Sequence, residues 1–186
     1  HKSEQQSILN YAMGERVTFP VDQSIGSLFS QQALIHPDRP ALCCGDRAYS
    51  YQRLDELTNR LAHYLKDHFG LGPERVVGIC MERSDWYVIS LLSVLKTGAA
   101  FAPIATDLPA ARRTYILSET EAALVLTEAE GLEAEVPVLC LPTTQSEWMN
   151  TSAQPIALDG NTTQLSYILY TSGSTGKPKG AMIEQG

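Results

Sequence analysis

The residues best suited to chemistry in this sequence lie in one stretch of eleven, YTSGSTGKPKG, from Tyr170 to Gly180. It contains three glycines, four small hydroxyl side chains and two lysines. Glycine adopts backbone angles that other residues avoid, so several amide N–H groups can converge on one anion. Hydroxyls add hydrogen-bond donors, and each lysine adds a positive charge. The stretch therefore predicts a phosphate-binding loop. Its candidate binding residues are Thr171, Ser172, Gly173, Ser174, Thr175, Gly176, Lys177 and Lys179.

Three other interpretations fit the stretch less well. The P-loop of common nucleotidases, G-x-x-x-x-G-K-[ST], would place Thr171 at its first glycine and Pro178 at its hydroxyl. A serine nucleophile of the S-x-x-K type, running from Ser174 to Lys177, would open a helix that Gly176 and Pro178 disrupt. A flexible Gly/Ser linker needs no lysines and seldom follows a strand-forming segment directly. Phosphate binding is the preferred interpretation.

Upstream of the loop, short apolar segments alternate with amphipathic ones. Helices are predicted to begin at Ser24, Ser50, Ser84 and Pro109, because serine caps helices and proline suits the first turn. A hairpin is predicted in ALCCGDRAYSY, and buried strands in RVVGICM, AAFAPI, ALVLT, VPVLCL and QLSYILY. Polar residues 142–163 are expected to form a surface connection. The alternation predicts an α/β fold with a mostly parallel sheet flanked by helices, and with ligands at the carboxyl ends of the strands.

The second predicted helix carries a continuous apolar stripe, which is expected to be buried in the core. Its members are Leu54, Leu57, Leu61, Tyr64 and Leu65.

The composition excludes some classes of partner. The chain has 14 lysine and arginine residues against 21 aspartate and glutamate residues, a formal net charge of −7. Such an acidic chain lacks the basic face that nucleic acids and anionic membranes require. No apolar run reaches the roughly 18 residues of a membrane helix, and the N-terminus is polar. We therefore expect a cytoplasmic protein that binds neither nucleic acid nor membrane.

The scattered cysteines, histidines, tryptophans and arginines indicate structural roles. No Cys/His grouping has the spacing of a metal site, so no metal ligand is predicted in this chain. Trp86 and Trp148 are expected to pack, and Arg112 and Arg113 to face solvent on a helix. Buried free thiols in a reducing compartment are expected for Cys43, Cys44, Cys80 and Cys140.

Three stretches together resemble one family. LSYILYTSGSTGKPKGAMIE closely resembles the phosphate-loop signature of adenylate-forming enzymes, roughly [YF]-[ST]-S-G-[ST]-T-G-x-P-K-G. YSYQRLDELTNRLAHYL resembles the early helix motif of amino-acid adenylation domains, and LLSVLKTGAAFAPI resembles their L-K-A-G-x-A-Y-V-P motif. Residues 21–186 are thus similar to the N-terminal part of an adenylation domain of a nonribosomal peptide synthetase. Residues 1–20 look like the linker that follows a condensation domain.

This resemblance implies a specific reaction. An amino-acid carboxylate would attack the α-phosphate of ATP, giving an aminoacyl-adenylate and pyrophosphate, with Mg²⁺ held by residues outside this chain. The amino acid would then pass to the phosphopantetheine thiol of a carrier domain. Thr171 to Gly176 would hold the β- and γ-phosphates, and Lys179 would be the catalytic cation. Lys177 falls at a variable position of the signature and would contribute less.

Two positions depart from the family pattern. Ala105-Thr106 stands where Asp-Pro is usual, and Gln185 stands where a histidine is usual that many members place near the ligand. Because the chain ends soon after the loop, we expect it to catalyse adenylation only with the rest of the domain, and its residues do not name the amino acid. Two alternatives stay open. One is an acyl- or aryl-CoA ligase, and the other is a non-catalytic module of a split or truncated synthetase.

Overall fold

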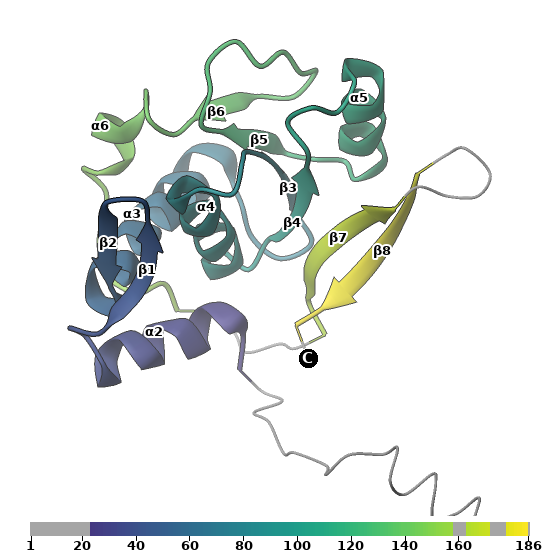
Figure 1. Ribbon diagram of the computed structural model, residues 1–186. Helices are drawn as coiled ribbons and strands as arrows, with labels where there is room; N and C mark the ends of the chain where they lie inside the picture. Colours follow the sequence, from purple (N-terminus) through teal and green to yellow (C-terminus); the bar gives the residue numbers. More distant parts are fainter. Residues whose placement is uncertain (1–22, 158–162, 172–177, 186) are drawn as a thin grey trace, which may run out of the picture.

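A six-stranded sheet forms the centre of the computed structural model, which describes residues 23–157, 163–171 and 178–185 (Figure 1). The strands are β3 (Val76–Cys80), β4 (Ala100–Ile104), β5 (Leu124–Thr127), β6 (Val138–Cys140), β7 (Leu165–Thr171) and β8 (Lys179–Glu184). Their spatial order is β6-β5-β3-β4-β7-β8, and all neighbouring pairs are parallel except β7 and β8. The predicted α/β fold with a mostly parallel sheet is confirmed.

Helices pack on both faces of this sheet. The helices α3 (Tyr51–Phe69) and α4 (Asp85–Lys96) cover one face, which includes Val77 and Ile79 of β3. The helix α5 (Ala110–Glu119) covers the other face, which includes Cys80. Parallel crossovers are right-handed, and β3-to-β4 and β4-to-β5 run in opposite directions across the sheet. The two crossover helices α4 and α5 therefore lie on opposite faces.

Two further elements precede the sheet in the chain. They are the helix α2 (Ile25–Ile35) and the antiparallel hairpin of β1 (Pro40–Cys44) and β2 (Arg47–Ser50). The three predicted serine caps are confirmed, since Ser24, Ser50 and Ser84 each accept a hydrogen bond from the N–H three residues on, at 3.1, 3.2 and 3.3 Å. All five residues of the predicted apolar stripe on α3 are buried.

The polar segment after β6 is more ordered than the sequence indicates. It contains a helical turn, α6 (Gln145–Trp148), and Trp148 is fully buried with its indole N–H donating to the Leu141 carbonyl at 3.2 Å. Side chains of α3 also donate to its backbone, as when Arg60 binds the Met149 carbonyl at 2.6 Å. The predicted surface connection is confirmed for most of the described part of residues 142–163, which is largely exposed, but Trp148 is buried and α3 supplies polar partners for the segment. The predicted packing of the tryptophans is confirmed by an edge-to-face contact between Trp86 and Trp148.

The cysteines are free, and the predicted burial is confirmed for one of the four and wrong for the other three. Cys80 is buried, whereas Cys43 is exposed and Cys44 and Cys140 are half-buried. Cys43 lies on the hairpin of β1 and β2, which forms a separate two-stranded sheet beside the core. Within the described residues, no helix is long and apolar enough to span a bilayer.

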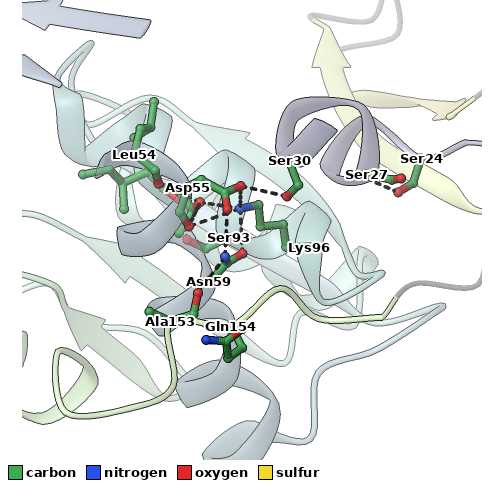
Figure 2. Close-up of polar contacts among 12 residues, drawn as sticks. Ser24, Ser27, Ser30, Leu54, Asp55, Asn59, Ser93, Lys96, Ala153 and Gln154 are labelled. Atoms are coloured by element: carbon green, nitrogen blue, oxygen red, sulfur yellow. Dashed lines mark hydrogen bonds and ion pairs between the residues drawn. The ribbon is translucent and has the colours of Figure 1, made fainter. Parts of the chain in front are cut away.

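A charged cluster lies inside the helical layer, centred on Lys96 at the end of α4 (Figure 2). The Lys96 ammonium lies 2.6 Å from Asp55 Oδ1, 2.8 Å from Thr58 Oγ1 and 2.7 Å from Asn59 Oδ1. Ser30 of α2 donates to the same Asp55 oxygen at 2.7 Å. Burial lowers the pKa of Lys96, and the Asp55 carboxylate opposes that shift. The cluster fastens α2 to α3 and α4, and no sequence pattern had singled it out.

Candidate phosphate-binding site

The predicted phosphate-binding residues lie at the end of an antiparallel hairpin formed by β7 and β8. Thr171 is the last residue of β7 and Lys179 the first of β8, and the two are direct cross-strand partners. Partners across an antiparallel pair project from the same face of the sheet, so these two side chains stand together at the ends of the loop. The remaining predicted residues lie outside those that the structure describes. They are Ser172, Gly173, Ser174, Thr175, Gly176 and Lys177.

Thr171 and Lys179 have the properties that a polyphosphate requires. Both are exposed, and Lys179 forms no ion pair with any described residue. An ammonium without a carboxylate partner is free to attract an anion, and the neighbouring hydroxyl adds a donor. Among the described residues, no group of three or more His, Cys, Asp or Glu is arranged to hold a metal ion. The pair is thus an exposed cation beside an exposed hydroxyl, a combination suited to an anionic ligand.

Tyr170 and Gly180 form the next pair along the hairpin. A Cβ atom added at Gly180 would lie 3.1 Å from Tyr170 Cζ and 3.0 Å from Ile168 Cγ2, so the Tyr170 ring lies against the glycine. Burial raises the pKa of the Tyr170 phenol, and the charges of Glu119 and Tyr115 add to that shift. Gly180 thus gives the aromatic ring room to pack over the base of the loop.

A crevice of about 530 Å³ opens at the carboxyl edge of the sheet. It is lined by residues 81–83, which follow β3, by residues 103–108 at and after the end of β4, and by Tyr170 of β7. At this point the two crossovers leave for opposite faces, which is where open α/β sheets bind their ligands. Because Tyr170 precedes Thr171, the crevice borders the hairpin end that carries the predicted loop.

Charged and aromatic side chains line this crevice. Arg83 and Arg112 contribute guanidinium groups, and Glu82 and Asp107 contribute carboxylates. Arg112 was predicted to face solvent on a helix; it lies on α5, where its side chain is half-buried and lines the crevice. Its position follows from α5 beginning directly after the loop that forms the crevice wall.

The unusual Ala105-Thr106 pair lies in that loop. The Thr106 hydroxyl donates to the Glu82 carboxylate and so joins the segment after β4 to the segment after β3. A second hollow of about 360 Å³ shares Glu82 and Thr106 with the crevice and continues towards Glu128. Thr106 thus donates a hydrogen bond that a proline at this position, which has no side-chain donor, could not make.

Gln185, the other departure from the family pattern, lies at the far end of β8 from Lys179. Its side-chain Oε1 accepts a hydrogen bond from the Ile25 backbone N–H of α2 at 3.1 Å. The backbone N–H of Gln185 donates to the Gln164 carbonyl at 3.0 Å. Gln185 therefore contacts α2 and the residue before β7, at the opposite end of β8 from Lys179. Sequence reasoning missed its contact because the partner is far away in the chain.

A family model described as "AMP-binding enzyme" matches residues 29–186, and the chain belongs to this family. The match includes the crevice, the β7–β8 hairpin and the whole predicted loop.

The chain is similar in sequence to parts of several peptide synthetases. It is 37% identical over 184 residues to surfactin synthase subunit 1 of Bacillus subtilis (strain 168), matching 98% of this chain and 5% of that protein. It is also 37% identical over 189 residues to tyrocidine synthase 1 of Brevibacillus parabrevis, matching 97% of this chain and 16% of that protein. The chain therefore spans only a small share of the curated relatives it matches.

Solved structures agree with the fold. The N-terminal subdomain of Klebsiella oxytoca NpsA, in complex with 3-hydroxybenzoyl-AMSN, superposes with a TM-score of 0.76 at 27% identity, over 88% of this chain and 41% of that one. The nonribosomal peptide synthetase FmoA3 in its AMPPNP-bound form shares the fold with a TM-score of 0.84 at 23% identity, over 97% of this chain and 19% of that one. The chain corresponds to part of an N-terminal adenylation subdomain.

Proposed function

We propose that the complete protein activates an amino acid with ATP for nonribosomal peptide synthesis. The observation that carries this proposal is the cross-strand pairing of Thr171 with Lys179 at the end of the β7–β8 hairpin, where Lys179 has no ion-pair partner among the described residues. That pair flanks a loop of glycines and hydroxyls in a chain of the AMP-binding enzyme family. The named relatives, which include surfactin and tyrocidine synthases, support an amino acid as substrate.

In the proposed reaction, a carboxylate oxygen of the amino acid bonds to the α-phosphorus of ATP. The bond from that phosphorus to the bridging oxygen breaks, and pyrophosphate leaves with the electron pair. Charge grows on the leaving pyrophosphate, so the main task of the protein is to hold and neutralise it. Lys179 supplies a cation for this purpose, and the hydroxyl of Thr171 supplies a donor.

The other predicted loop residues extend this role. Hydroxyls and amide N–H groups of the loop would bind the β- and γ-phosphates, and Lys177 would add a second, weaker contact. These groups belong to Ser172, Gly173, Ser174, Thr175, Gly176 and Lys177. Mg²⁺, when bound, neutralises part of the phosphate charge. We propose that its ligands lie in the rest of the domain, outside this chain.

The proposal extends to the partners of the complete protein. The activated amino acid passes to the phosphopantetheine thiol of a carrier domain, an arrangement supported by the solved fusion of NpsA to the carrier protein ThdA. Residues 1–20 would link this domain to an upstream condensation domain. The free cysteines among the described residues are consistent with a location in the reducing cytoplasm.

A second candidate substrate class is an aryl acid. The solved NpsA complexes contain 3-hydroxybenzoyl and anthranilyl ligands, and NpsA is 27% to 28% identical to this chain. An aryl acid reacts through the same carboxylate chemistry, so the residues described here serve both classes equally.

The test is ATP–pyrophosphate exchange by the protein extended to its natural C-terminus. One reaction contains a pool of amino acids, and a second contains a pool of fatty and aryl acids. Exchange with amino acids alone supports the proposal, and exchange with the second pool alone moves the protein to the aryl or acyl ligases. Exchange with neither would contradict adenylation and leave a non-catalytic module. Lys179→Ala is the control that shows whether exchange depends on the loop.

A further inference from the structure

The β7–β8 hairpin is attached to the rest of the sheet through a short contact. β7 pairs with β8 at six positions, whereas the pairing of β7 with β4 has the single register position Phe101 to Tyr167. β8 is an edge strand, and all six of its residues are exposed. On its inner side the hairpin is anchored to β4, where Phe101 stacks on Tyr167 and Ile168 packs against Ala100 and Ala102. On its outer side β8 has no further strand partner among the described residues, so the placement of Lys179 depends on what else holds β8.

A second attachment lies at the foot of the hairpin, where β8 ends beside the N-terminus of α2 (Figure 1). The first N–H of α2, that of Ile25, has no acceptor within the helix, as at every helix start. The Ser24 hydroxyl accepts a hydrogen bond from the Ser27 N–H, and the Gln185 side-chain oxygen accepts one from the Ile25 N–H. An acceptor placed there also interacts favourably with the helix dipole. Gln185 is thus a helix-capping residue supplied from a distant part of the chain.

The helix that Gln185 caps is itself held firmly. Figure 2 shows Ser30 of α2 directed at Asp55, which pairs with the buried Lys96. The ring of Phe29, also on α2, lies 5.4 Å from the Lys96 ammonium. Only 3% of the Lys96 side chain is exposed, so this attachment is shielded from water. A force on the foot of the hairpin is therefore resisted by the helical layer rather than by a loose segment.

We propose that Gln185 is a positioning residue for ATP, which fixes the tilt of the β7–β8 hairpin by docking its foot to α2. This inference rests on the proposed function. The role requires a hydrogen-bond acceptor at the first N–H of α2. The charge or the size of the side chain at position 185 does not fulfil this requirement by itself. A neutral histidine, the residue usual at this position in the family, also carries a nitrogen acceptor. Gln185 supplies this acceptor from an amide, a group that does not titrate near neutral pH.

The test compares variants of the complete enzyme in ATP–pyrophosphate exchange. Gln185→Met keeps the length of the side chain and removes the acceptor, and Gln185→His restores an acceptor. We expect Gln185→Met to raise the KM for ATP about fivefold, the factor that a neutral hydrogen bond is worth, with the KM for the acid substrate unchanged. Gln185→His should stay close to the parent. Glu184→Gln, one residue earlier on the exposed strand, is the matched control and should change neither constant.

Hydrogen exchange supplies a readout that does not depend on activity. The Ile25 amide should be protected in the parent and in Gln185→His, and should exchange faster in Gln185→Met. If the amide becomes exposed while the KM for ATP stays the same, Gln185 is only a cap and the positioning role is wrong. If the amide stays protected in Gln185→Met, the contact itself is wrong. If the parent enzyme showed no ATP–pyrophosphate exchange, the proposed function would be wrong. Hydrogen exchange at the Ile25 amide would still test the contact with Gln185.

Discussion

Thr171 and Lys179 face each other as the last cross-strand pair of the β7–β8 hairpin, one on each side of the predicted phosphate-binding loop. Lys179 has no carboxylate partner among the described residues, so its charge is available to a ligand. We expect Lys179→Ala to slow adenylation in the complete enzyme at least tenfold, which corresponds to about 1.4 kcal/mol of barrier. Single-turnover formation of the adenylate measures this directly. Lys177→Ala is the comparison and should have the smaller effect, and equal rates for Lys179→Ala and the parent would remove Lys179 from the reaction.

Gly78 lies in the centre of β3 with no room for a side chain. A Cβ atom added there would meet Leu117 Cδ2 at 2.8 Å and Ile104 Cδ1 at 3.2 Å, between the sheet and α5. We expect Gly78→Ala to destabilise the protein by about 1–3 kcal/mol, the usual range for an overpacked core. Gly72→Ala is the matched control, because nothing lies within 4 Å of the added atom there. Urea unfolding of both variants tests the difference, and equal midpoints would show that α5 moves aside freely.

Tyr49 should make the stability of the protein depend on pH in the alkaline range. Burial, the hydrogen bond to Asp85 at 2.5 Å and the charge of that carboxylate raise the pKa of Tyr49 from 10.0 to about 12. Between these values the unfolded phenol has lost its proton and the folded one keeps it. The unfolded state then binds fewer protons, so stability is full below pH 10 and falls as the pH rises towards 12.

Tyr49→Phe isolates this effect. Below pH 9 the variant should be less stable than the parent by roughly 1.5–3 kcal/mol, because Asp85 loses a hydrogen bond to its charge. The gap should narrow at higher pH as the parent loses the contribution of Tyr49. Urea unfolding at a series of pH values measures the gap, and a constant gap from pH 9 to 11 would contradict the assigned shift.

Ser166 should contribute nothing favourable through its hydroxyl. The residue is 1% exposed on β7, and its Oγ has no hydrogen-bond partner among the described residues. A buried hydroxyl without a partner costs free energy, so Ser166→Ala should leave the stability unchanged or raise it by up to about 1 kcal/mol. Ser93→Ala is the control, because Ser93 is equally buried and donates to the Ile89 carbonyl at 2.7 Å. Ser93→Ala should lower the melting temperature more than Ser166→Ala does. If Ser166→Ala lowered it more, the Ser166 hydroxyl would have a hydrogen-bond partner.

Local patterns predicted the elements of the fold correctly. Ser24, Ser50 and Ser84 cap the expected helices because a serine hydroxyl satisfies a nearby N–H, a signal contained within four residues. The apolar stripe on α3 and the five strands up to β7 followed from periodicity, which is also local. The phosphate-binding stretch was found in the same way, since its residue types and spacing are contiguous.

The features that the sequence did not reveal all depend on distant partners. Trp148 was expected to pack, but nothing near residue 148 indicates that α3 is the helix that receives the segment around it. Lys96 belongs to the LLSVLKTGAAFAPI stretch, but its role appears only when Asp55 and Asn59 are brought to it. β8 was missed as well, because its residues are exposed and its register is set by β7.

Strand order differs from chain order in this sheet, and that difference sets a waiting time during synthesis on the ribosome. β3 to β6 can assemble once residue 140 has emerged, but one edge of β4 stays unpaired until β7 arrives. At ~5–20 residues per second, the residues between Ile104 and Leu165 take roughly 3–12 s to add. During this interval the apolar edge of Ala100–Ile104 is open to other nascent chains. We expect chaperone contact to concentrate at β4 in that window and to end when the hairpin closes.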